Sequence, residues 1–221
     1  MKTITKRQAT VVYKGTFSRN LLGVYDRRGQ LFSLMLSIGE SAKLGKSSVS
    51  EAGKTFNPID MDLQLAWPEK DLKYDIKLAT FEGEASKSGE QDLELFFAAG
   101  DRLLAGVKTT DNPVAVLNHE FTYDIHGDVV GGSWKDMVDG LFPGSMKVAG
   151  YETLTKTGGF IFKRGENEWV RIYLERSFIV ENGIFLRTVF VLTGDVELAI
   201  ATAAWRRTVA LLCKEFDVEL R

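Results

Sequence analysis

The chain has 221 residues, of which 44% are hydrophobic and 26% are charged, so it is long enough and apolar enough to bury a core. This composition excludes disordered and fibrous proteins, and a formal net charge of −2 argues against indiscriminate binding to duplex DNA. The charge is uneven, because residues 1–50 sum to +7 and residues 51–130 sum to −9. Such polarity indicates either a basic face for an acidic partner or contact between the two segments within one fold.

Three features of the sequence bear on the cellular compartment. The first eight residues carry charges where an export signal needs an apolar stretch. The most apolar window, Val196–Phe216, contains Arg206 and Arg207 at its centre, which a membrane-spanning helix would not tolerate. The single cysteine, Cys213, excludes a disulfide framework and a cysteine-based metal site. We therefore expect a cytoplasmic protein with no cofactor and no membrane contact.

The first predicted elements are β-strands. Thr10–Tyr13 is expected to be a strand, and Leu21–Tyr25 and Leu31–Ile38 to form a hairpin whose tip carries Arg27 and Arg28. Further along, apolar and polar residues alternate in two segments that are separated by a turn. These two segments are Met61–Leu65 and Leu72–Leu78, and they predict an antiparallel pair.

Two segments rich in small and polar residues, 39–58 and 82–91, predict mobile loops. Between and after them, several short apolar runs predict further strands. The candidates are Leu93–Phe97, Val114–Leu117, Glu120–Ile125, Phe160–Phe162 and Val170–Leu174.

The last third of the chain combines a hairpin with two helices. Ser133 is placed to cap a short helix over Trp134–Leu141. Phe178–Glu181 and Ile184–Leu186 flank Asn182-Gly183, a dipeptide typical of a tight hairpin turn. A long C-terminal helix is expected because apolar residues recur on one stripe of it, and Asp195 is placed to cap its N-terminus. The stripe consists of Leu198, Trp205, Val209, Leu212 and Phe216.

These elements predict an α+β fold of predominantly antiparallel β-structure with a long C-terminal helix packed on the sheet. The sheet could take the form of a sandwich, an open barrel or a highly curved sheet. We expect residues 1–221 to form a single globular domain. The sequence shows no internal repeat of the period found in solenoids or propellers.

The segment from His119 to Asp128 contains the best set of residues for catalysis. In a strand, Glu120, Asp124 and His126 would project from one face and could supply a metal or an acid–base pair. An ordinary solvated strand face explains the same pattern. The sequence therefore favours no metal site and no enzyme, and keeps these three residues as metal candidates.

The strand around Val170 supplies a different kind of site. Alternation places Trp169, Arg171 and Tyr173 on one face and the aliphatic residues Val170, Ile172 and Leu174 on the other. Aromatic and arginine side chains anchor protein interfaces and stack on unpaired bases. The predicted interaction residues join this set to four basic residues: Trp169, Arg171, Tyr173, Lys14, Arg19, Arg27 and Arg28.

From these observations we favour a non-catalytic binding or assembly protein that acts through protein–protein contacts, with a protein partner or self-association. One alternative is a single-stranded nucleic-acid-binding protein that uses the basic N-terminal segment and the aromatic strand face. The other is a small metal-dependent or hydrolytic enzyme that uses residues 119–128.

Overall fold

The computed structural model describes residues 2–23, 27–52, 62–110, 114–141 and 158–221. The strands in this part form one sheet in the order β2-β3-β4-β5-β1-β6-β9-β8-β7, and β10 pairs in parallel with the start of β1. All other strand pairs are antiparallel. The strands are β1 (Lys2–Phe17), β2 (Ser48–Ala52), β3 (Asp62–Trp67), β4 (Leu72–Ile76), β5 (Thr80–Ser86), β6 (Val116–Val130), β7 (Gly158–Arg164), β8 (Glu168–Arg176), β9 (Ile184–Thr193) and β10 (Val218–Leu220).

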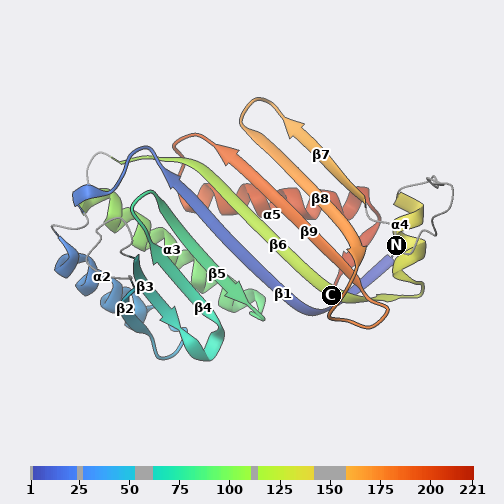
Figure 1. Ribbon diagram of the computed structural model, residues 1–221, viewed down its shortest axis with the longest axis horizontal. Helices are drawn as coiled ribbons and strands as arrows, with labels where there is room; N and C mark the ends of the chain where they lie inside the picture. Colours follow the sequence, from blue (N-terminus) through green and yellow to red (C-terminus); the bar gives the residue numbers. More distant parts are fainter. Residues whose placement is uncertain (1, 24–26, 53–61, 111–113, 142–157) are drawn as a thin grey trace, which may run out of the picture.

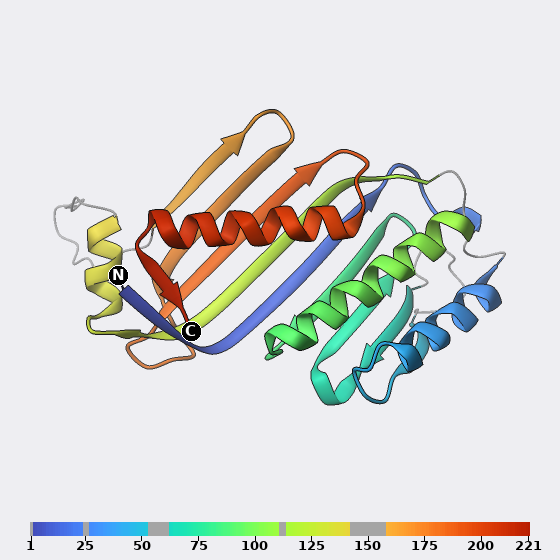
Figure 2. The same cartoon turned by 180° about the vertical axis from the view of Figure 1, so that it is seen from behind.

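Helices cover one face of this sheet. Figures 1 and 2 show α2, α3 and α5 behind the strands in one view and in front of them in the other, with α4 at one end of the sheet. No described helix covers the opposite face. The predicted α+β fold with a C-terminal helix on the sheet is therefore confirmed, in the form of one open sheet. The helices are α2 (Arg28–Ser41), α3 (Glu90–Thr110), α4 (Trp134–Leu141) and α5 (Leu198–Glu215).

Aromatic side chains hold the helices to the sheet. Phe121 of β6 is fully buried and stacks on Trp205 of α5, with ring centroids 5.3 Å apart. The same ring lies 5.0 Å from Tyr13 of β1, 6.0 Å from Phe97 of α3 and 6.2 Å from Phe190 of β9. Phe121 therefore joins the two central strands to both long helices, and such aromatic pairs add stability beyond the area they bury.

The order of elements occurs twice along the chain. The first set is β1, α2, β2, β3, β4, β5 and α3, and the second is β6, α4, β7, β8, β9 and α5, in which the described residues hold no counterpart of β2. Within the sheet the first set is ordered β3-β4-β5-β1 and the second β6-β9-β8-β7. Because β1 and β6 are antiparallel neighbours, the two sets are related by an approximate twofold rotation about an axis between these strands.

Two predicted strands are helices in the structure. The segment Leu31–Ile38 lies in α2, where Leu31, Met35 and Ile38 recur at helical spacing and are buried. The predicted hairpin with Arg27 and Arg28 at its tip is therefore wrong, although residues 24–26 lie outside the described part. Leu93–Phe97 lies in α3, whose inward side buries Phe96, Leu103 and other apolar residues at the same period.

The two predicted loops contain regular structure. Within 39–58, the first residues complete α2 and residues 48–52 form β2, while residues 53–58 lie outside the described part. Within 82–91, residues up to Ser86 belong to β5 and those from Glu90 belong to α3. Gly83 and Ala85 are small and therefore suggest a loop, but at Gly83 the small size is required by packing. A Cβ at Gly83 would come within 2.4 Å of Tyr74 Cε1, so the strand needs a glycine beneath that ring.

One hairpin prediction is confirmed and another is corrected. β3 and β4 pair through the turn that contains Pro68, as predicted. Ile184–Leu186 does lie in a hairpin, but it pairs with residues 174–176 of β8 and not with Phe178–Glu181. Ser177 is the reason, because its Oγ accepts hydrogen bonds from the backbone N–H groups of Ile179 and Val180 and holds residues 177–183 as a wider loop.

Of the two predicted helix N-caps, one is confirmed and the other is wrong. Ser133 caps α4 as predicted: its Oγ accepts a hydrogen bond from Asp136 N at 3.1 Å, and an Asp136 carboxylate oxygen accepts one from Ser133 N at 3.1 Å. Asp195 does not cap α5. The N-cap residue is Glu197, which makes no side-chain cap, and Asp195 pairs with Lys108 of α3 at 3.2 Å.

We expect Ser133→Ala to lower the free energy of unfolding by about 1 kcal/mol, because the N-terminal N–H groups of α4 lose their acceptor. Urea denaturation followed by circular dichroism measures this difference. Ser88→Ala is the matched control, since the Ser88 hydroxyl only donates to Ser86 O, and its variant should stay within about 0.5 kcal/mol of the wild type. Equal effects of the two substitutions would contradict the capping role.

Candidate interaction surface on the uncovered sheet face

The β8 strand places the predicted aromatic residues on the uncovered face. Its alternate residues Val170, Ile172 and Leu174 are buried toward the helices. Trp169, Arg171 and Tyr173 therefore project from the opposite face, as the alternation predicts. Trp169 and Arg171 are partly buried, whereas Tyr173 is 43% exposed.

Neighbouring strands complete a patch around these residues. On β7, Ile161 lies opposite Arg171 and is 68% exposed. On β9, Val189 lies opposite Arg171 from the other side. Gly159 lies opposite Tyr173, and a Cβ there would come within 3.0 Å of the Tyr173 ring, so the ring packs on the bare backbone of β7. We call Ile161, Trp169, Arg171 and Tyr173 the aromatic patch.

Arg171 is the polar group at the centre of the aromatic patch. Its guanidinium carbon lies 5.6 Å from the Trp169 ring centroid, which is a cation–π contact. Its Nε atom is buried and makes no hydrogen bond to any described residue. A buried donor without an acceptor is costly, so an acceptor supplied from outside the chain would be favourable at this position.

Next to the aromatic patch, cations are already paired. Arg187 of β9 donates two hydrogen bonds to the Asp124 carboxylate, from Nε at 2.7 Å and from Nη2 at 2.6 Å. Its guanidinium carbon also lies 5.4 Å from the Phe185 ring centroid. This bidentate pair neutralises both charges.

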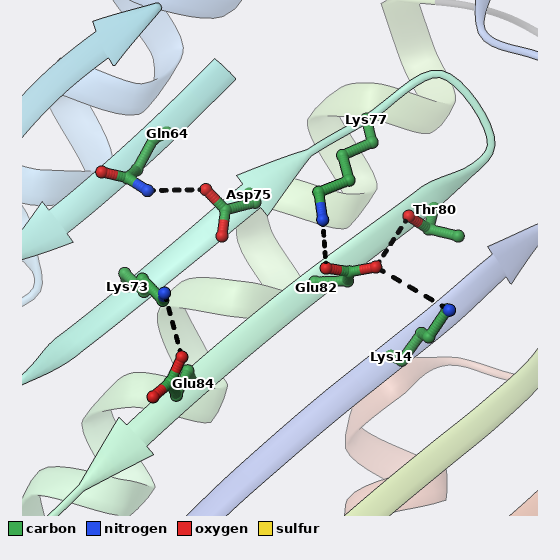
Figure 3. A network of polar contacts seen from close by, with 8 residues as sticks. All are labelled: Lys14, Gln64, Lys73, Asp75, Lys77, Thr80, Glu82 and Glu84. Carbon is green, nitrogen blue, oxygen red and sulfur yellow. Dashed lines mark hydrogen bonds and ion pairs between the residues drawn. The ribbon is translucent and has the colours of Figure 1, made fainter. Parts of the chain in front are cut away.

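The other half of the uncovered face is a network of polar side chains, shown in Figure 3. Glu82 accepts hydrogen bonds from Lys77 and Thr80 and lies 3.9 Å from Lys14 Nζ. Lys73 pairs with Glu84 at 2.9 Å. The lysines on this half are thus paired with carboxylates of neighbouring strands.

Counted over the described residues, the uncovered face carries no excess of positive charge. On the half with the aromatic patch, three cations (Lys163, Arg171 and Arg187) share the face with three carboxylates (Glu120, Asp124 and Glu175). The other half has three lysines and four carboxylates: Lys14, Lys73, Lys77, Asp62, Asp75, Glu82 and Glu84. Desolvation lowers the pKa of His126, which therefore adds no charge near neutral pH.

The three metal candidates do share this face but do not converge. Asp124 is held by Arg187, and His126 makes a 2.9 Å hydrogen bond to Ser177 Oγ through Nδ1 and stacks on Phe185. Glu120 lies further along the strand. In the described part of the chain, no three His, Cys, Asp or Glu side chains are placed to hold a metal ion together.

The predicted basic residues are separated from the aromatic patch. Lys14 lies on the uncovered face but beside Glu82, in the other half of the sheet. Arg27 and Arg28 lie at the start of α2, on the helix-covered side, where Arg28 pairs with Glu51 at 2.8 Å. Arg19 is exposed just beyond the end of β1. The structure thus brings together Trp169, Arg171 and Tyr173 but not the basic set.

The other residues of this surface were not predicted from the sequence. Ile161 and Val189 are adjacent to Arg171 only because β7 and β9 flank β8, and strand order cannot be obtained from alternation within single strands. Alternation within β7 is the one available signal, since it separates Ile161 from Phe160 and Phe162, which stack near Phe216 on the helix-covered side.

The comparisons with known proteins give little further information. No family model matches the chain, and no curated protein matches it. Among solved structures, it is similar to a rolling circle replication initiator protein from Geobacillus stearothermophilus, with 13% sequence identity and a TM-score of 0.35 over 93% of this chain and 83% of the other. At this TM-score the likeness supports no functional conclusion. Within the described residues, no helix combines the length and the apolar character needed to span a membrane.

Proposed function

We propose that this is a non-catalytic assembly protein that binds a second copy of itself through the aromatic patch. The observation that carries the proposal is the set of Ile161, Trp169, Arg171 and Tyr173 on the uncovered face of β7 and β8, where β7 is the last strand of the sheet in the described part of the chain. Ile161 and Tyr173 are exposed, and the other two are partly buried. Tryptophan, tyrosine and arginine contribute most to protein interfaces when they lie at the centre of a patch. Exposed apolar patches of this kind mark interaction sites.

The balance of charge favours a protein over a nucleic acid as the occupant. Single-stranded nucleic acids bind in grooves with excess positive charge, whereas this face carries equal or larger numbers of carboxylates. A neutral patch that contains both signs is complementary to a copy of itself. In that arrangement, a carboxylate of the second copy, such as Glu175, would accept the hydrogen bond that Arg171 Nε lacks.

Size-exclusion chromatography with light scattering, over a range of protein concentrations, tests this proposal. The wild-type chain should form dimers, and Ile161→Glu and Tyr173→Ser should each weaken dimerisation at least tenfold, since a hot-spot residue contributes about 2 kcal/mol or more. Both side chains are exposed enough for the variants to keep their fold, which circular dichroism verifies.

The matched control is Ile200→Glu on α5, whose side chain is 54% exposed on the opposite side of the molecule. It should leave the dimer unchanged. A wild-type chain that stays monomeric at all concentrations, or a dimer that survives both patch variants, would refute the proposal. Fluorescence anisotropy with single-stranded oligonucleotides at low salt tests the alternative function. If the chain is monomeric and binds these oligonucleotides, and Tyr173→Ser abolishes the binding, nucleic-acid binding replaces self-association as the proposed function.

A further inference from the structure

On the helix-covered side, α3 and α5 diverge toward the N-terminal end of α3, as Figure 2 shows. Two adjoining cavities of about 370 and 570 Å³ lie there, and both are lined by Glu90, Leu93 and Tyr123. Volumes of about 300–1,000 Å³ are typical of small-molecule sites. We call the two cavities together the interhelical groove.

One end of the interhelical groove is apolar. Most of its apolar lining comes from α5 and β10: Trp205, Val209, Ala210, Val218 and Leu220. Trp205 itself is held in place by its stacking on Phe121. A hydrocarbon chain or ring at this end would remove apolar surface from water, which is favourable.

The other end of the interhelical groove is basic. Lys6, Arg7, Lys87 and Arg221 line it, and they come from three separate parts of the chain. Arg7 and Arg221 have carboxylate partners, Asp128 at 2.5 Å and Glu219 at 2.9 Å, and Lys87 lies 3.9 Å from Asp71. Lys6 makes no ion pair with any described residue.

Two carboxylates also line the groove, and they lie nearer its apolar end. Glu90 is neutralised by Arg206 of α5 at 2.5 Å, and Glu219 is held by its partner Arg221 and by a hydrogen bond from Thr3. The unpaired charge that remains is the ammonium group of Lys6. The groove thus offers an excess of cations at one end and hydrocarbon surface at the other.

Tyr123 stands at the junction of the two ends. It lines both cavities. No hydrogen bond of its hydroxyl is found among the described residues. Burial raises the pKa of this phenol to about 12, and the neighbouring Glu90 adds to the shift. The hydroxyl therefore keeps its proton and can donate a hydrogen bond to an anion that also contacts Lys6.

We propose that the interhelical groove binds an amphipathic anion, with its apolar body against Trp205, Val209 and Ala210 and its acidic head between Tyr123 and Lys6. The ligand class is an unbranched or cyclic hydrocarbon that carries one carboxylate or phosphate. The site lies on the opposite side of the sheet from the aromatic patch, so it does not depend on self-association.

Isothermal titration calorimetry of the full chain with dodecanoate, dodecyl phosphate, dodecanol and inorganic phosphate tests this proposal. The two amphipathic anions should bind in a one-to-one ratio, and both dodecanol and inorganic phosphate should bind at least tenfold more weakly. The ratio of the dodecanoate to the dodecyl phosphate affinity identifies the preferred head group. Affinity should fall as salt is raised, because the head group is held by charge.

Two pairs of variants locate the site. Ala210→Trp should fill the apolar end and abolish dodecanoate binding, whereas Ala203→Trp, at an exposed position on the same helix, should not. Lys6→Gln should weaken dodecanoate about tenfold, whereas Lys14→Gln, on the uncovered face, should not. Equal affinity for dodecanol and dodecanoate, or binding that survives Ala210→Trp, would overturn the proposal.

Discussion

Phe121→Ala should lower the free energy of unfolding by about 3–5 kcal/mol, which is a large share of the stability of a typical domain. The ring is fully buried and touches Tyr13, Phe97, Phe190 and Trp205, which belong to four different elements. Its removal leaves a cavity that rigid aromatic neighbours cannot fill by collapse. Equilibrium denaturation in urea measures the loss.

Phe178→Ala is the matched control for this experiment, because Phe178 is 88% exposed in the loop between β8 and β9. Its variant should unfold within about 0.5 kcal/mol of the wild type. A Phe121→Ala protein that loses less than about 1.5 kcal/mol would contradict the view that this ring joins the two central strands to α3 and α5.

Acidification from pH 7.5 to pH 4 should cost the protein about 3 kcal/mol through His119 alone. Burial lowers the pKa of His119 from 6.5 to about 4, and the positive charge of Lys108 adds to the shift. The opposing influences, the backbone of Val196 and the negative charge of Asp195, offset only part of it. Each pKa unit corresponds to about 1.4 kcal/mol.

The direction of this effect follows from proton binding. Between pH 6.5 and 4 the unfolded chain holds a proton on His119 and the folded chain does not, so stability falls as the pH falls through this window. Below pH 4 both states are protonated and the loss stops growing. The His119 ring is also hydrogen-bonded through Nδ1 to the Tyr13 hydroxyl at 3.0 Å, and burial, which raises the pKa of that phenol, keeps Tyr13 protonated.

The measurement is the difference in unfolding free energy between the wild type and His119→Gln across pH 7.5 to 4, because carboxylates titrate in both proteins and cancel. The pH dependence should be about 3 kcal/mol shallower in the variant. His126→Gln is the control of the same residue type, and it should keep most of the wild-type slope because His126 is less buried. Parallel curves for the wild type and His119→Gln would refute the assignment.

Strands with one solvent-exposed face were predictable from the sequence, whereas helices with wide apolar sides were not. In Leu72–Leu78 strict alternation has a single interpretation, and β4 lies there. In α3 the run from Leu93 to Phe97 is apolar enough to suggest a buried strand, although the recurrence of Phe96, Leu103 and Val107 over the following residues is helical. The longer window would have identified the helix.

The candidate surface was also predictable only in part. The faces of Trp169, Arg171 and Tyr173 follow from alternation in one strand, and the structure has them where the sequence predicts. Their separation from Arg27 and Arg28 depends on which side of the sheet α2 packs, and this is a tertiary property. The interhelical groove was likewise not predictable, because Lys6, Lys87 and Tyr123 meet only after the sheet order is set.

The twofold relation between the two sets of elements is the arrangement that would result from joining the two subunits of a homodimer into one chain. In such a homodimer, β1 of each subunit would pair with β1 of the other, as β1 pairs with β6 here. Either half alone would leave the edge of its long strand bare. In a single chain the two halves need not be identical, and on the uncovered face they differ: one half carries paired lysines and carboxylates, and the other carries Trp169, Arg171 and Tyr173.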